Sequence, residues 1–109
     1  MAISLLYGFQ NATNTTTSFT MTLPATVTQA GDILICEFAH RGNGDCTVAG
    51  TTVTTGGVTW TLKKSQLFGS SAFSGKTYWA RATGDHQGQT VTGTGLTNSC
   101  AAILTVYRG

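Results

Sequence analysis

The chain has 109 residues, of which 9% are charged and 40% are hydrophobic, and its formal net charge is +2. This length allows one domain with a buried core and leaves no room for a second. The hydrophobic content argues against disorder, and the small net charge argues against nucleic acid or an anionic membrane as a partner. Neutral polar side chains must therefore cover the surface, and threonine, at roughly one residue in five, is their main source.

The first third of the chain shows the alternation typical of β-strands. Residues 3–9 place their hydrophobic side chains at odd positions, so Leu5 and Tyr7 are expected on one face of a half-buried strand. Residues 18–23 show the same alternation of hydrophobic and polar side chains, so a second strand is expected there. Residues 32–40 are hydrophobic on both faces apart from Glu37, which indicates a strand in the middle of a sheet.

The middle of the chain predicts a turn followed by two further strands. Glycine and asparagine in residues 41–45 favour the positive φ of a tight hairpin, so the chain should reverse there. A weak threonine-rich strand is expected over residues 46–54. A clearer strand is expected over residues 58–62, where Trp60 belongs to the hydrophobic half of a regular alternation.

In the last third of the chain, residues 69–75 predict a loop of small residues. Strands are predicted over residues 76–82, 89–94 and 99–108. The loop carries Phe73. In the first of these strands Tyr78 and Trp79 point to opposite faces, so one of the two must face outward or contact a partner. The closing strand is hydrophobic on both sides and should lie in the middle of a sheet.

No segment carries the hydrophobic stripe of an amphipathic helix. About eight strands with turns every 8 to 12 residues are typical of a β-sandwich. The expected fold is therefore all-β, a single immunoglobulin-like or jelly-roll sandwich over residues 1–109 with mostly antiparallel strands. The core of this sandwich is expected to contain Leu34, Phe38, Trp60, Ile103 and Leu104.

The three cysteines, Cys36, Cys46 and Cys100, cannot all pair within one chain, and their spacing matches no zinc or redox motif. Free, at least partly buried thiols are expected instead. His40 and Cys46 flank the predicted turn, but two ligands without a third make a poor zinc site. We therefore expect neither a metal nor a cofactor.

The acidic residues are Asp32, Glu37, Asp45 and Asp85. All except Glu37 lie in or beside turns, where an aspartate side chain can bond the nearby backbone. No Gly-x-Ser-x-Gly motif is present, and neither His40 nor His86 has an obvious nucleophile beside it. We therefore expect a protein without catalytic residues that is not an enzyme.

The candidate interface residues are Tyr78, Trp79, Phe73 and Glu37. Glu37 interrupts a hydrophobic strand, so its carboxylate must be paired or must point to solvent or to a neighbouring subunit. An aromatic ring exposed at Tyr78 or Trp79 would suit either a protein partner or the hydrophobic face of a sugar ring.

Four spaced segments, residues 31–35, 57–62, 78–85 and 102–109, together resemble a family of small β-sandwich proteins of phage virions and bacterial prophage regions. The similarity covers residues 31–109. Members are capsid decoration proteins, head fibres or modules of tail fibres, and they bring no catalytic residues to this chain. The resemblance implies a virion structural protein that binds the outer shell, and hence the major capsid protein or another virion protein, as a homo-oligomer, most simply a homotrimer. The alternative is a tail-fibre module or a glycan-binding adhesion module.

The same interpretation predicts where the protein is made and where it acts. Residues 1–6 lack the basic start and hydrophobic stretch of a secretory signal, so synthesis in the cytoplasm of a bacterial host and residence in the virion are expected. The longest hydrophobic runs are far shorter than the roughly 20 residues that span a bilayer, so no membrane partner is expected.

Overall fold

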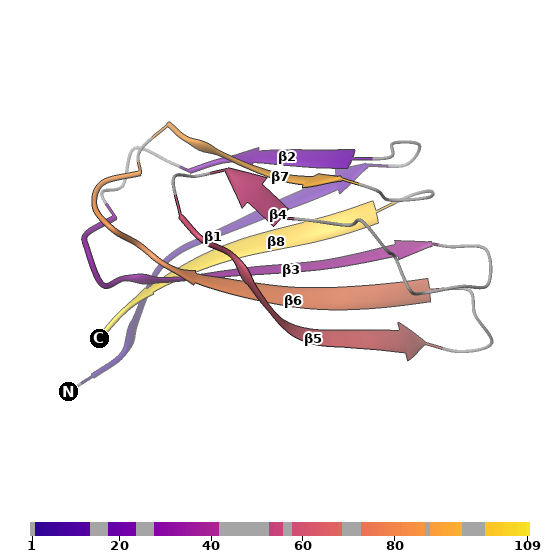
Figure 1. Cartoon of the computed structure of the whole chain (residues 1–109), viewed down its shortest axis with the longest axis horizontal. Helices are drawn as coiled ribbons and strands as arrows, with labels where there is room; N and C mark the ends of the chain where they lie inside the picture. Colours follow the sequence, from indigo (N-terminus) through magenta and orange to yellow (C-terminus); the bar gives the residue numbers. More distant parts are fainter. Residues whose placement is uncertain are drawn as a thin grey trace.

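The computed structural model describes residues 2–13, 18–23, 28–41, 53–55, 58–68, 73–86, 88–94 and 100–109. Its elements are β1 (Ser4–Thr13), β2 (Ser18–Thr22), β3 (Ile33–Arg41), β4 (Val53–Thr55), β5 (Thr61–Phe68), β6 (Phe73–Arg81), β7 (Thr90–Thr94) and β8 (Cys100–Arg108). All are strands, and they pack as two antiparallel sheets (Figure 1). The predicted all-β sandwich is confirmed.

The larger sheet has the strand order β1-β8-β3-β6-β5, and the smaller has the order β2-β7-β4. β1 pairs with β8, β2 with β7 and β3 with β6, all antiparallel. In the sequence each of these pairs encloses the next, as in one long hairpin that is wrapped over two sheets. This nesting is the topology of a jelly roll. One strand departs from it, because β5 pairs with β6 in the larger sheet rather than with β4.

The core lies between the two sheets. Successive side chains of a strand point to opposite faces, so every second residue of a strand contributes to the core. In β3 the side chains of Leu34, Cys36 and Phe38 are buried, and in β8 those of Leu104 and Val106. The smaller sheet contributes its own buried side chains from β2 and β7, namely Phe19, Met21 and Val91.

Phe38 lies between two other rings and links the sheets. The Phe19 ring approaches it from the smaller sheet, with the centroids 5.2 Å apart and the rings tilted. The Tyr78 ring from the neighbouring strand β6 stacks beside Phe38 at 6.0 Å. A Cβ at Gly93, which is paired with Phe19, would overlap the Phe19 ring, so this position in β7 requires glycine.

The prediction that Leu5 and Tyr7 share a face is wrong. Pairing of β1 with β8 is irregular between these residues: Leu5 is opposite Tyr107, but Tyr7 is opposite Val106. Such a β-bulge adds one residue and reverses the side on which later side chains lie. Leu5 is therefore exposed on the far side of the sheet, whereas Tyr7 packs against the core.

Two of the predicted core residues are placed differently by the structure. Leu34, Phe38 and Leu104 are buried as expected, but Ile103 is 41% exposed, because it points away from the smaller sheet. Trp60 is only half-buried, and it packs against the buried core residues without being one of them.

The strand predicted over residues 58–62 begins later, at Thr61, and runs on to Phe68. The loop predicted over residues 69–75 is shorter, because Phe73 already opens β6. The turn predicted over residues 41–45 and the thiol of Cys46 lie outside the described residues beyond Arg41.

The alternation along β8 predicts a strong contrast between neighbouring positions. Leu104→Ala removes a fully buried side chain and should lower the free energy of unfolding by about 2–5 kcal/mol. Ile103→Ala is the matched control, and its cost should be much smaller because the side chain already contacts water. Urea denaturation of both variants measures the difference, and equal losses would contradict the assignment of faces.

Candidate functional site

The smaller sheet covers one face of the five-stranded sheet, and the other face, here called the outer face, carries exposed side chains. Glu37 is exposed on this face and Trp79 is half-buried there. Tyr78 points the opposite way into the core, which corrects its assignment as an interface residue. Phe73 opens β6, and its side chain lies outside the described part of the chain.

A groove crosses the outer face at right angles to the strands. Strand register places one row of side chains across the groove. Glu37 of β3 is opposite Ile103 of β8 on one side and Thr77 of β6 on the other. Thr77 is in turn opposite Lys64 of β5. The Thr77 hydroxyl donates a hydrogen bond to Glu37 Oε1 at 3.4 Å. The Glu37 carboxylate, which accepts hydrogen bonds, and the Lys64 ammonium, which donates them, thus lie on either side of the Thr77 hydroxyl.

The next row along the same strands explains why the surface is hollow there. Ala101, Ala39, Gly75 and Gln66 are opposite one another across four strands, and three of these four side chains are very small. Together with the preceding row they enclose a groove of about 400 Å³. This volume falls within the range of roughly 300–1,000 Å³ typical of small-molecule sites.

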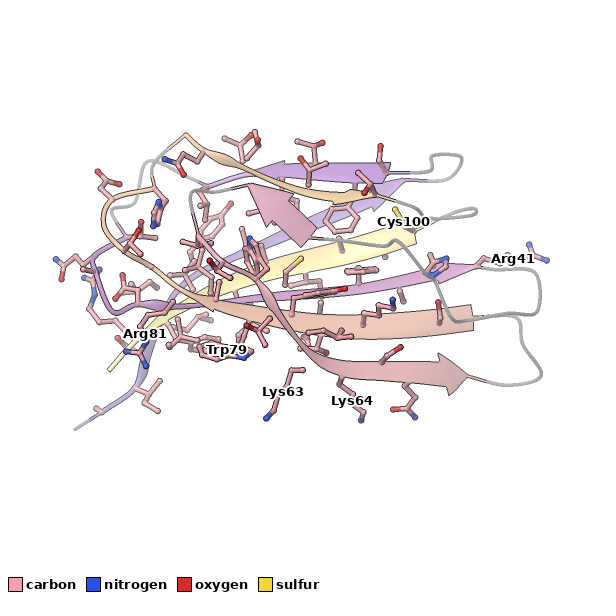
Figure 2. All side chains as sticks on the ribbon, viewed as in Figure 1. Arg41, Lys63, Lys64, Trp79, Arg81 and Cys100 are labelled. Atoms are coloured by element: carbon pink, nitrogen blue, oxygen red, sulfur yellow. The ribbon has the colours of Figure 1, made fainter. Side chains whose placement is uncertain are left out.

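Positive charge predominates around the groove. Arg41, Lys63 and Lys64 are exposed on β3 and β5, and Figure 2 shows Lys63, Lys64 and Trp79 projecting to the same side of the sheet. Arg81 is also exposed, but it is opposite Ile33, at the other end of β6 from the groove. An irregularity in the pairing of β5 with β6 between Leu62 and Lys64 leaves Lys63 as an extra residue. Among the described residues of the outer face, Glu37 supplies the negative charge.

A hydrophobic surface, here called the terminal patch, occupies the end of the outer face near both chain termini (Figure 1). It consists of Ile3, Leu5, Ile33 and Tyr107. Register brings Leu5, Tyr107 and Ile33 side by side on β1, β8 and β3. Ile3 is 78% exposed and Leu5 is 60% exposed, and the other two are partly exposed.

Asp32 has the predicted turn role together with an ion pair that the sequence did not reveal. Its carboxylate accepts a hydrogen bond from the backbone N–H of Gln29 at 2.8 Å. It also accepts two from Arg108, from Nε at 2.8 Å and from Nη2 at 2.7 Å. The hydrogen bond from Arg108 is the main reason that the pKa of Asp32 is lowered from its ordinary value.

A row of polar side chains at the far end of the core was missed by sequence reasoning. His40 of β3 is opposite Ser74 of β6 and opposite Cys100 of β8, all facing inward and buried. The Ser74 hydroxyl and His40 Nε2 are hydrogen-bonded at 2.5 Å. No motif joins positions 40 and 74, so only strand register shows the pair. Burial leaves it out of reach of a substrate.

The thiols and the second histidine are also enclosed. Cys36 and Cys100 carry buried thiols, as predicted, and burial raises the pKa of Cys36 to about 12. His86 accepts a hydrogen bond at Nε2 from the backbone N–H of Thr83, and the backbone N–H of His86 donates to the Thr28 hydroxyl. This network holds the connection between β6 and β7.

Within the described ranges, no three histidine, cysteine, aspartate or glutamate side chains are grouped so that they could hold a metal ion. The same residues contain no helix long and apolar enough to cross a membrane. No family model matches the chain, and no curated protein or solved structure matches it either. The family resemblance of residues 31–109 therefore stays a prediction.

His40 predicts a pH dependence of stability. Burial is the main cause that lowers its pKa from 6.5, and the charge of Lys76 adds to it, so the unfolded chain binds the proton more tightly than the folded protein. The contribution of His40 to stability is complete above pH 6.5 and is lost progressively as the pH falls below that value. Denaturation from about pH 7 to pH 5 should show a steeper decline for the parent protein than for His40→Gln. Parallel curves would contradict this.

Proposed function

We propose that the protein is a structural protein of a phage virion, which binds the outer surface of the capsid as a homo-oligomer, most simply a trimer. The observation that carries the proposal is the terminal patch, where Ile3 and Leu5 expose most of their side chains. Exposed hydrophobic side chains grouped beside polar surface mark sites of protein contact. Burying them against a subunit or a shell protein would provide the driving force for assembly.

The low charge of the chain supports docking to protein. With 9% charged residues, few strongly hydrated groups must lose water when two surfaces meet. Homo-oligomers usually have closed symmetry, and a trimer at a threefold position of a capsid would bind three equivalent sites at once. Modest individual contacts would then add up to stable attachment.

The fold is compatible with this proposal but does not single it out. Jelly rolls occur both in viral capsid domains and in lectins, and a fold alone does not identify a function. The terminal patch favours a protein partner, whereas the groove favours the glycan-binding alternative. The two surfaces lie at different places on the outer face, and each can be tested separately.

Light scattering tests the oligomer directly. The purified protein at micromolar concentration should have a mass three times the 11.4 kDa of the chain. Imaging of the particle should then place its density on the shell. A monomer would overturn self-association, and density on the tail alone would favour the tail-fibre alternative.

Variants at two exposed leucines test the terminal patch. Leu5→Lys places a charge in the patch and should abolish both the oligomer and co-sedimentation with particles. Leu62→Lys is the matched control, because Leu62 is 46% exposed on β5, at the opposite edge of the sheet from β1. Thermal melting verifies that both variants are folded. Equal behaviour of the two folded variants would show that the patch is not the contact surface.

A further inference from the structure

We propose that the groove on the outer face is a binding site for an acidic saccharide. The groove combines a hydrophobic floor with a few polar groups at its rim, the composition typical of small-molecule sites. Ala39 and Ala101 form part of the floor, while Glu37, Thr77, Lys64 and Gln66 supply the polar groups. This site is separate from the terminal patch and does not depend on the proposed function.

The polar groups suit a ligand with many hydroxyls. The exposed Glu37 carboxylate only accepts hydrogen bonds, so it requires donors, and the hydroxyls of a sugar ring are donors. The Lys64 ammonium only donates, whereas the Gln66 amide does both. Because Glu37 and Lys64 both neighbour Thr77 but lie on different strands, they can contact opposite edges of one ring.

The floor suits the hydrophobic C–H face of such a ring. Gly75, Ala39 and Ala101 leave space above the sheet, and the exposed Ile103 closes one end of the groove. Trp79 lies on the same face, two residues along β6 from Thr77. A saccharide longer than one ring could extend from the groove toward the indole, whose face packs well against sugar.

The surrounding charge favours an acidic saccharide over a neutral one. Lys63 and Lys64 are exposed on β5, and a sugar carboxylate in the groove would pair with Lys64. Nucleic acid fits less well, because phosphates would approach the Glu37 carboxylate and because the chain has a net charge of only +2. A hydroxyl-rich chain with spaced carboxylates satisfies both Glu37 and Lys64.

Calorimetry with the complete chain and defined oligosaccharides tests the proposal. The probes are tetrasaccharides of galacturonate, hyaluronan and sialic acid, with the methyl ester of the first as its neutral counterpart. At least one acidic probe should bind, and esterification should weaken the binding of galacturonate if that is the probe bound. Failure of all three acidic probes at millimolar concentration would overturn the proposal, as would tighter binding of the ester than of the acid.

Three variants separate a built site from general attraction between opposite charges. Lys64→Ala should weaken binding about tenfold, as expected for loss of a hydrogen bond between charged groups. Lys63→Ala is the matched control, since it removes the same charge from the adjacent exposed residue outside the groove, and it should have little effect. Equal losses in the two lysine variants would overturn the site.

Glu37→Gln distinguishes the two explanations by the sign of its effect. If the saccharide hydroxyls donate to the carboxylate, this variant should bind more weakly, because a charged acceptor is replaced by a neutral one. If attraction between opposite charges alone holds the ligand, removal of the negative charge should strengthen binding. Stronger binding by folded Glu37→Gln would therefore overturn the proposal. Thermal melting verifies the fold of each variant.

Discussion

Pairing of β3 with β8 on one side and β6 on the other is the constraint on which the remaining structure depends. It joins residues 33–41 to residues 100–108 and 73–81, segments far apart in the sequence. Once this register is set, alternate side chains of the three strands face the side covered by the smaller sheet, and the others lie on the outer face. The buried row through Leu104 and the exposed row through Glu37 are thus two results of the same pairing.

Polar pairs at both ends of β3 stabilise this register. Just before the strand, Asp32 accepts hydrogen bonds from Arg108 at the end of β8, and the backbone continues the ladder as Ala82 N–H donates to Asp32 C=O. At the other end His40 is bonded to Ser74 of β6. A shift by one residue would separate these partners, leave buried polar groups unpaired and move the hydrophobic side chains to the wrong face. The pairs therefore oppose slippage more than hydrophobic burial alone would.

Local alternation predicted most of the strands because it reports directly which side chains one strand buries. Phe19 and Met21 in β2 and Leu34 and Phe38 in β3 follow it. Ile103 does not, because a strand that is hydrophobic on both sides gives no sign that only one side is covered. The bulge after Leu5 was also hidden, since an inserted residue depends on the partner strand.

The groove was beyond sequence reasoning for a different reason. It arises where Gly75, Ala39 and Ala101 meet across three strands, and no local motif relates such distant positions. Glu37 was the one signal, because a carboxylate in a hydrophobic strand requires a partner or solvent. Its neighbours Thr77 and Lys64 followed only from the register of β6 and β5.

Side-chain volume at outward positions explains how one uncovered face provides two different surfaces. At the start of β3 these positions carry Ile33 and its neighbours Leu5 and Tyr107, whose bulk forms a raised hydrophobic patch. Further along β3 they carry Ala39 and its neighbours, which leave a hollow with polar groups at its rim. A raised hydrophobic surface fits the broad face of another protein, whereas a hollow of this size fits a small polar ring. Six residues of extended chain separate Ile33 from Ala39, a distance of about 20 Å. A contact confined to the terminal patch would therefore leave the groove open to solvent, so the two proposed roles, attachment to a shell and capture of a saccharide, are compatible on one sheet.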